Sequence, residues 1–188
     1  MKPPLIIIGS APCVIADISA LPLVSCDYML VGLSSVDKWL GRADYFVTMH
    51  PDDIPKSLAR RQQFGGNTDF LQVISHTTQR EEGDGSVTNF PGVTMIQPYE
   101  KPPGSSALLG VFAALKLGYE RIILAGCPLD ETVPHNTFIN GRTFQAQPYT
   151  DYQRGWQHHL DRYIGKVRSL SGWTKQFLGY PTEEWLNG

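Results

Sequence analysis

Side chains that could move a proton or bind an anion gather in one polar stretch of the sequence, residues 131–148. His135 and Arg142 lie within it, and Asp130 directly precedes it. Imidazole is the usual base in group transfer because it titrates near neutral pH, and a guanidinium group can bind phosphate through paired hydrogen bonds. We therefore predict His135 as a base, Arg142 as an anion contact, and Asp130 as a group that orients the base or binds a sugar hydroxyl. Each could instead be an ordinary loop or surface residue.

A second candidate base comes from two adjacent histidines, His158 and His159. They face different ways on the helix predicted for residues 151–163, so one of them could simply pack in the core, and we retain His158 as the alternative base. Cys127 could act as a nucleophile, but the sequence names no partner for it. Aromatic residues nearby could stack on a ligand, although their helical spacing favours core packing: Tyr149, Tyr152, Trp156 and Tyr163.

The first element that could position such groups is a strand followed by a turn of small residues. Residues 5–8 are wholly apolar, which is the pattern of a parallel strand buried on both faces. The turn after it is formed by Gly9, Ser10, Ala11, Pro12 and Cys13. Small residues let the backbone approach a ligand closely, and a strand, glycine turn and helix is the arrangement that cradles phosphate. The turn matches neither the dinucleotide fingerprint nor the Walker loop.

A second unit, residues 104–130, joins a helix to a buried strand without a gap. Gly118 ends the helix, and residues 121–125 form the strand. Small residues mark both ends of this unit: Gly104, Ser105 and Ser106 before the helix, and Gly126, Cys127 and Pro128 after the strand. Ligands bind beyond the carboxyl ends of the strands of an open α/β sheet, and helix N-termini there attract anions. We therefore predict that both sets border a ligand, with an anion at the helix N-terminus. An ordinary α/β unit with a capped helix would show the same pattern and stays the alternative.

Further strands complete the expected sheet: residues 27–32, 44–49, 70–75, 93–97 and 166–170. Ser34 and His50 each follow one of these strands, so we place them on the ligand side. Ser34 could instead serve only as a helix cap, and His50 could be an ordinary loop residue. Helices are predicted at residues 36–40, 54–64 and 151–163, with a short last helix that stops near residue 179; residues 77–89 read as a loop. The expected fold is one Rossmann-like α/β domain over residues 1–188, with a mainly parallel sheet of about six or seven strands and helices on both faces.

The composition excludes several classes of protein. The net charge of −2 gives no reason to expect nucleic acid as the main partner, although a nucleic acid acceptor stays open. Three cysteines without C-x-x-C spacing indicate neither a disulfide framework nor a zinc site. Asp52 and Asp53 serve more simply as a helix cap than as a metal pair, so we predict no metal site and no cofactor. Because the sequence shows no signal peptide and no membrane-length apolar run, we expect a soluble cytoplasmic protein, with a homo-oligomer possible.

With both small-residue turns in view, the chain resembles the small bacterial sialyltransferase family and its wider group of bacterial, archaeal and phage relatives, including the archaeal pterin diphosphokinase-like proteins. That group pairs a G-x-G-P-S turn with a later segment S-G-x-x-x-x-x-A-x-x-x-G-Y-x-x-I-x-L-x-G. The matching residues here are Gly9 to Cys13, then Ser105, Ser106, Ala113 or Ala114, Gly118, Tyr119, Ile122, Leu124 and Gly126. Ala11, Cys13 and Ser106 depart from the pattern, and no tyrosine lies between Tyr119 and Tyr149.

The resemblance implies a nucleotide-sugar donor, bound without a metal. Carried over by position, residues 9–13 would hold the nucleotide, Ser105 and Ser106 would face its phosphate, and residues 126–128 would border the base. The leading function is then a glycosyltransferase-like enzyme that transfers a sugar to an unknown acceptor. Two alternatives stay open: a magnesium-dependent pyrophosphoryl or nucleotidyl transferase, and a non-catalytic nucleotide-binding phage accessory protein. The resemblance also implies tyrosines soon after residue 126 that stabilise the leaving phosphate. Their absence favours the non-catalytic protein, whereas the polar stretch with His135 favours an enzyme.

Overall fold

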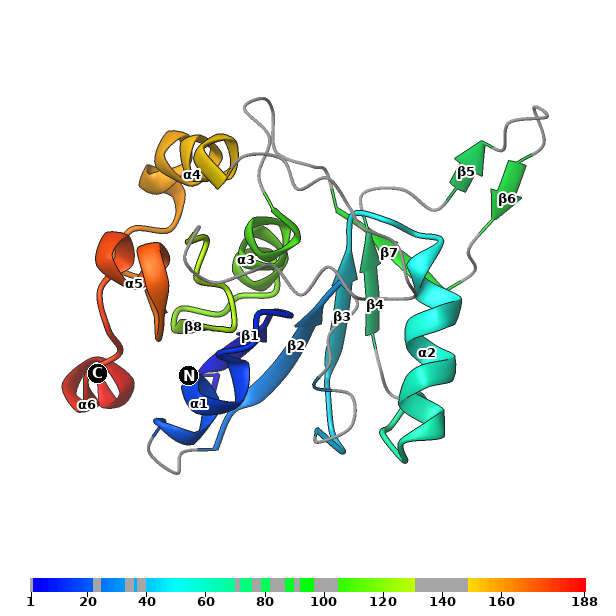
Figure 1. Ribbon diagram of the computed structural model, residues 1–188, viewed down its shortest axis with the longest axis horizontal. Coiled ribbons are helices and arrows are strands. Elements are labelled where there is room, and N and C mark those ends of the chain that lie inside the picture. The colour runs from blue at the N-terminus through cyan, green and yellow to red at the C-terminus, as the bar shows by residue number, and fades with distance from the viewer. Residues whose placement is uncertain are drawn as a thin grey trace.

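The computed structural model describes residues 2–21, 25–32, 36, 40–69, 72–75, 79–81, 87–89, 92–96, 105–130 and 149–188. Strands and helices alternate through most of this chain (Figure 1). In order they are β1 (Leu5–Ile8), α1 (Val14–Ser19), β2 (Asp27–Val31), β3 (Tyr45–Thr48), α2 (Asp53–Gln63), β4 (Gln72–Ser75), β5 (Gln79–Glu81), β6 (Val87–Asn89), β7 (Val93–Met95), α3 (Ser106–Lys116), β8 (Ile122–Ala125), α4 (Tyr149–His158), the 3₁₀ helix η2 (Leu160–Arg162), β9 (Val167–Ser169), α5 (Gly172–Leu178) and α6 (Glu183–Asn187).

Seven of these strands form one sheet in the order β7-β4-β3-β2-β1-β8-β9. Every pairing in it is parallel. The predicted α/β fold with a mainly parallel sheet of six or seven strands is therefore confirmed. The chain builds outward from β1 to β7 on one side, and α3 then carries it back so that β8 pairs with the other side of β1. This reversal makes the gap beyond β1 and β8 the topological switch point of the sheet.

The central strands β1 and β8 are buried on both faces of the sheet because they carry apolar residues at consecutive positions. Side chains alternate along a strand, so Leu5 and Ile7 of β1 join a core with α3, Trp156 of α4 and Leu178 of α5. Ile6 and Ile8 join the opposite core. That second core is completed by residues from the other face: Val14 of α1, Ile54 of α2 and Leu186 of α6. The four residues of β1 are at most 2% exposed, and such burial stabilises by about 1.5–3 kcal/mol per side chain.

Helix α3 lies close to the sheet because Gly110 has no side chain. A Cβ there would stand 3.0 Å from Val31 Cγ1 and 3.3 Å from Met29 Sδ. Ser105 begins the helix as its N-cap, with its hydroxyl accepting from Leu108 N at 3.4 Å, and Gly118 follows its end at φ +83°. Both ends agree with the sequence prediction. The close approach fixes where the N-terminus of α3 stands relative to the strands.

Some local predictions were wrong. Residues 77–89 were predicted as a loop, but β5 and β6 pair there as an antiparallel hairpin that projects from the body in Figure 1. The predicted helix over residues 151–163 ends at His158 and continues as the shorter turn η2, since Gly155 and the paired histidines weaken its helix propensity. The short helix predicted to stop near residue 179 does so, since α5 ends at Leu178, but it is not the last helix. Thr182 caps a further helix, α6, through a hydrogen bond from Trp185 N.

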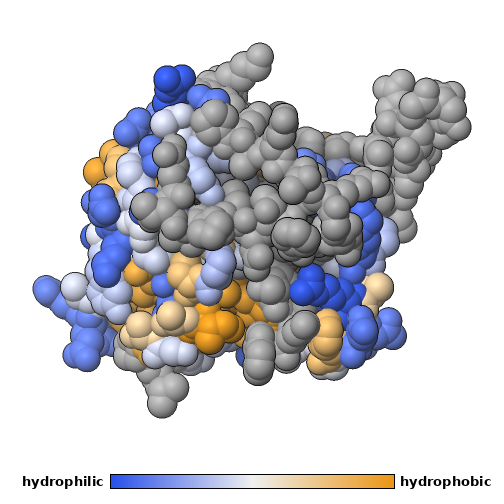
Figure 2. Space-filling model, viewed as in Figure 1, coloured by the Kyte–Doolittle hydropathy of each residue, from blue (hydrophilic) through white to orange (hydrophobic). Residues whose placement is uncertain are grey.

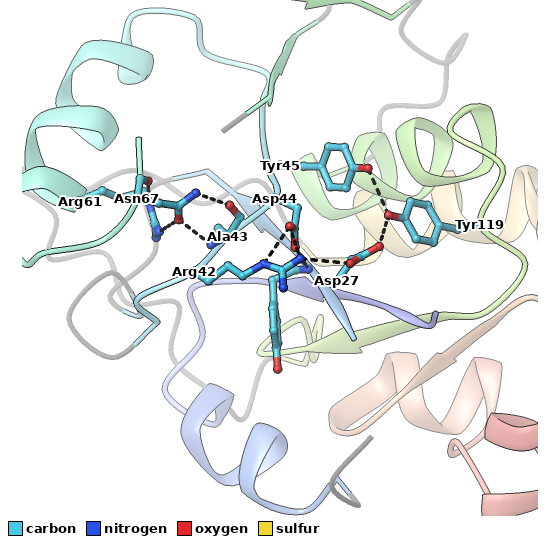
Figure 3. Close-up of polar contacts among 9 residues, drawn as sticks. Asp27, Arg42, Ala43, Asp44, Tyr45, Arg61, Asn67 and Tyr119 are labelled. Carbon is cyan, nitrogen blue, oxygen red and sulfur yellow. Dashed lines mark hydrogen bonds and ion pairs between the residues drawn. The ribbon is translucent and has the colours of Figure 1, made fainter. Parts of the chain in front are cut away.

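The amino edge of the sheet, where β2 and β3 begin, carries a cluster of polar side chains (Figure 3). Tyr119 donates a 2.5 Å hydrogen bond to Asp27 Oδ2, and its hydroxyl lies 3.1 Å from that of Tyr45. Arg42 bonds Asp44 Oδ1 at 2.7 Å and lies 3.5 Å from Asp27 Oδ1. Burial raises the pKa of Tyr119 well above its ordinary value, and the bond to Asp27 raises it further. The polar groups of this cluster therefore make their hydrogen bonds and ion pairs with one another.

The surface of the described chain is mixed in character. In Figure 2, hydrophobic residues gather low on the visible face, over α1 and the neighbouring part of the sheet, with hydrophilic residues to either side. Ile15 of α1 is 47% exposed. Among the described residues, the helices are all too short or too polar to pass through a bilayer.

Candidate functional site

A pocket of about 250 Å³ opens at the carboxyl edge of the sheet, at the switch point between β1 and β8. Its walls come from the ends of β1, β2, β3 and β8 and from the start of α3. Seven residues predicted for the ligand side line it: Gly9, Ser10, His50, Ser105, Ser106, Gly126 and Cys127. Six further residues complete the lining: Val31, Gly32, Met49, Ala107, Leu129 and Tyr152. The two small-residue turns, far apart in the sequence, thus share one pocket.

The floor of the pocket is a close contact between two backbone turns. Gly9 N donates to Ala125 O at 2.8 Å, and Ala11 N donates to Gly126 O at 3.2 Å. A Cβ on Gly9 would stand 2.6 Å from Cys127 Sγ and closer still to Gly126 O. Gly126 has φ +65°, and a Cβ there would stand 2.7 Å from Val14 Cβ. Glycine is needed at both positions, because any side chain would push the two turns apart.

The N-terminus of α3 supplies hydrogen-bond donors to one wall. Ser105 and Ser106 both border the pocket and are partly exposed. The first backbone N–H groups of a helix have no partner within the helix, and the helix dipole there favours negative charge. Trp156 Nε1 donates to Ser105 Oγ at 3.4 Å, so that α4 holds the start of α3 in place. Hydroxyls and amides arranged in this way suit an anionic group such as phosphate.

His50 is held at the rim by its backbone. Its N–H donates to Thr48 Oγ1 at 2.9 Å, the Thr48 hydroxyl donates to His50 O at 3.1 Å, and Ser75 Oγ donates to Thr48 O at 2.9 Å. The His50 side chain itself is exposed. Burial raises the pKa of nearby Asp53, and the histidine opposes that rise. The sequence prediction placed His50 on the ligand side, and it borders the pocket there.

Two other titratable groups line the pocket. Cys127 is buried, and burial raises the pKa of its thiol far above the usual range, so it is held as a neutral thiol. A reactive cysteine needs a lowered pKa, and this one is therefore a poor nucleophile. Tyr152 comes from α4, and burial also raises the pKa of its phenol. The sequence favoured core packing for Tyr152; in the structure it both packs against the core and reaches the pocket.

The remaining predicted residues lie elsewhere. Ala11 is buried behind the pocket, Pro12 is exposed, and the Cys13 thiol lies 3.4 Å from Ser171 Oγ. Pro128 packs against Gly172, which has φ +62° and no room for a Cβ. Asp130 follows the lining residue Leu129 without lining the pocket, and His158 is exposed at the end of α4. Four predicted residues lie outside the described ranges: Ser34, Gly104, His135 and Arg142.

Some lining residues were missed by sequence reasoning. Val31, Gly32 and Met49 stand at the ends of strands that the sequence did predict, so the rule that placed His50 could have found them as well. In the part of the chain that the structure describes, no group of three or more His, Cys, Asp or Glu residues is arranged to hold a metal ion.

Sialyltransferases are among the solved structures that share this fold. The chain is similar to the sialyltransferase CstII from Campylobacter jejuni in complex with a substrate analogue, cytidine-5'-monophosphate, with a TM-score of 0.66, 14% identity, and coverage of 97% of this chain and 86% of that one. It is equally similar to the sialyltransferase CST-II in complex with a trisaccharide acceptor and CMP, with a TM-score of 0.66, 14% identity, and coverage of 98% and 88%. At this identity the likeness shows a shared fold. No protein-family model and no curated protein matches the chain.

Proposed function

We propose that this protein binds a nucleotide sugar in the pocket between the Gly9 turn and α3 and transfers the sugar to an acceptor without a metal. The observation that carries the proposal is the pocket itself. It joins the two turns that sequence reasoning assigned to a nucleotide, at the switch point of a sheet whose fold is shared with CMP-binding sialyltransferases. Ligands of open α/β sheets bind at this point.

The pocket's chemistry favours a donor that leaves as a nucleoside monophosphate. Its polar lining consists of hydroxyls, backbone amides and one histidine, and hydroxyl and amide donors suit the single negative charge of a phosphodiester. In the transfer, the bond from the anomeric carbon to the phosphate oxygen breaks, and the bond from that carbon to the acceptor oxygen forms. The acceptor proton passes to a base, and the monophosphate leaves with the charge that Ser106 and the first amides of α3 stabilise.

The proposed base is His135, which belongs to the stretch that follows the lining residue Leu129. Arg142 in the same stretch offsets the phosphate charge by paired hydrogen bonds. His50 contacts the donor from the rim. These roles are separable: loss of the base slows transfer and leaves nucleotide binding unchanged, whereas loss of a donor contact weakens nucleotide binding.

The first test is a binding screen with CMP, UMP, UDP and ATP, each in EDTA and in magnesium chloride. CMP or UMP at 100 times its dissociation constant should stabilise the fold by roughly 2.7 kcal/mol in both buffers. Stabilisation only by a triphosphate with magnesium would move the assignment to a nucleotidyl or pyrophosphoryl transferase. If none of the four nucleotides stabilises the fold, the proposal is overturned.

The second test follows release of CMP from a CMP-linked sugar by chromatography, with and without candidate acceptor sugars. Ser106→Ala should weaken CMP binding about tenfold, the loss of one hydrogen bond to a charged group. Ser19→Ala, an exposed serine at the end of α1, is the control and should bind as the native protein does. His135→Ala should slow release with CMP affinity unchanged; native rates in that variant would remove His135 from the mechanism.

A further inference from the structure

Behind the pocket lies a buried carboxylate that is not part of the lining. Asp17, in the first turn of α1, is 6% exposed. Its Oδ2 accepts a 2.7 Å hydrogen bond from Gly126 N and another of 2.7 Å from Ser171 Oγ. Asp17 is the only charged residue between Lys2 and Asp27 in the sequence. A buried charge is costly unless it is hydrogen-bonded, and one of these partners, Gly126, lines the pocket.

The hydrogen bond from Gly126 matters because of where that residue stands. Gly126 is in the left-handed region and packs against Gly9 across the pocket floor. A bond between a carboxylate and a backbone amide is stronger than one between neutral groups, so Asp17 fixes the direction in which the chain leaves β8. That direction determines where Cys127 and Leu129 meet the pocket.

A second set of bonds ties the same turn to the C-terminal part of the chain. Thr174 Oγ1 donates to Cys127 O at 2.8 Å, and Thr174 N donates to Pro128 O at 3.2 Å. Ser169 Oγ lies 2.8 Å from the Thr174 hydroxyl. Ser171, between them, is the residue that donates to Asp17. The wall after β8 is therefore held from both sides, by α1 through Asp17 and by α5 through Thr174.

We propose that Asp17 is a positioning residue that sets the Gly126–Cys127 wall of the pocket and thereby determines its affinity for a nucleotide. The inference rests on the function proposed above and adds a residue that touches no ligand. The direction in which ligand affinity changes when Asp17 is replaced distinguishes this role from a direct effect of its charge. If the negative charge of Asp17 acted only at a distance, removing it would strengthen binding of an anion, because like charges repel. As a positioning residue, its loss weakens binding.

The experiment measures calorimetric affinity for CMP and for uncharged cytidine in the native protein, in Asp17→Asn and in Asp27→Asn. Asp27 is a matched control, since it is a partly buried aspartate that also accepts from a hydroxyl, at the opposite edge of the sheet. Asp17→Asn should bind both ligands at least tenfold more weakly, about 1.4 kcal/mol, and Asp27→Asn should bind them as the native protein does. If Asp17→Asn does not fold, Ser171→Ala serves in its place, with affinity lowered about threefold.

A second measurement needs no ligand. The Gly126 amide should exchange slowly with solvent in the native protein and in Asp27→Asn, and faster in Asp17→Asn, as followed by NMR. Unchanged or tighter CMP binding in Asp17→Asn would overturn the role of Asp17 and leave the proposed function standing. Equal rates of Gly126 amide exchange in the two variants would do the same. A native protein that binds no nucleotide overturns the proposed function, and faster Gly126 exchange in Asp17→Asn would then support only the anchoring of the wall.

Discussion

The amino and carboxyl edges of the sheet carry similar polar groups, but these groups are arranged differently at the two edges. At the amino edge, Asp27, Tyr45 and Tyr119 bond to one another. At the carboxyl edge, glycines and serines keep side chains short, and backbone groups face a cavity. An aspartate that accepts from a hydroxyl occurs at both edges, but Asp17 also takes a backbone amide of the wall. The side chains close one edge by bonding to one another, and the pocket opens at the other edge.

The largest effect should come from filling the space between the two turns. Gly9→Ala places a methyl group 2.6 Å from Cys127 Sγ, and such overpacking costs about 3 kcal/mol. Urea denaturation should show this loss together with loss of CMP binding. Gly41→Ala is the control, because nothing lies within 4 Å of a Cβ there and its φ is ordinary. Native stability in Gly9→Ala would mean that the turns are not in contact.

The next largest effect is expected at the closed edge. Tyr119→Phe removes the hydroxyl that donates to Asp27 and bonds Tyr45. Because the Asp27 carboxylate loses a partner within a partly buried cluster, the free energy of unfolding should fall by about 2 kcal/mol. Nucleotide affinity should stay the same. A loss of nucleotide affinity in this variant would show that the two edges of the sheet are energetically coupled.

The same tyrosine predicts how stability changes at high pH. Burial raises the pKa of Tyr119 in the folded protein, whereas in the unfolded chain a tyrosine releases its proton near pH 10. The contribution of this group is thus fully present below about pH 10 and is lost as pH rises further. Denaturation between pH 8 and 11 should show a steeper fall in native protein than in Tyr119→Phe. Parallel curves for the two proteins would contradict the assignment.

A smaller effect separates capping from ligand contact. Ser105→Ala and Thr182→Ala each remove an N-cap hydrogen bond, from α3 and α6 respectively. Each should lower stability by about 1 kcal/mol. Only Ser105→Ala should also weaken CMP binding, since only α3 begins at the pocket. Equal CMP affinity in both variants would assign Ser105 to capping alone.

The smallest effect is expected from the exposed ion pair at the closed edge. The side chain of Arg42 is 67% exposed where it meets Asp44, and exposed pairs of this kind contribute little because water screens them. Thermal denaturation of Arg42→Ala should match that of the native protein. A clear drop in its Tm would make the ion pair part of what holds the closed edge together.

The sequence predicts the fold better than it predicts the site. Wholly apolar strands such as Leu5–Ile8 and the Ser105 cap are local signals, and the structure confirms the sheet and the helix start. The rule that ligands bind at strand ends correctly brought Gly9, His50 and Gly126 together. Asp17 could not be found in this way, since its role depends on pairing with Gly126 and Ser171, 109 and 154 residues later. Its isolation as a charge was the one signal available.

The pairing of β1 with β8 has a consequence for how the protein is made. Leu5 of β1 pairs with Ile122 of β8. More than a hundred residues must therefore be synthesised after β1 before β8, one of its two neighbouring strands, can pair with it. Thr174 and Ser171 must then dock before the wall after β8 is held. A chain emerging from a ribosome at about 5–20 residues per second therefore passes several seconds without its pocket. Ligand binding by nascent chains of increasing length would report the completion of this step.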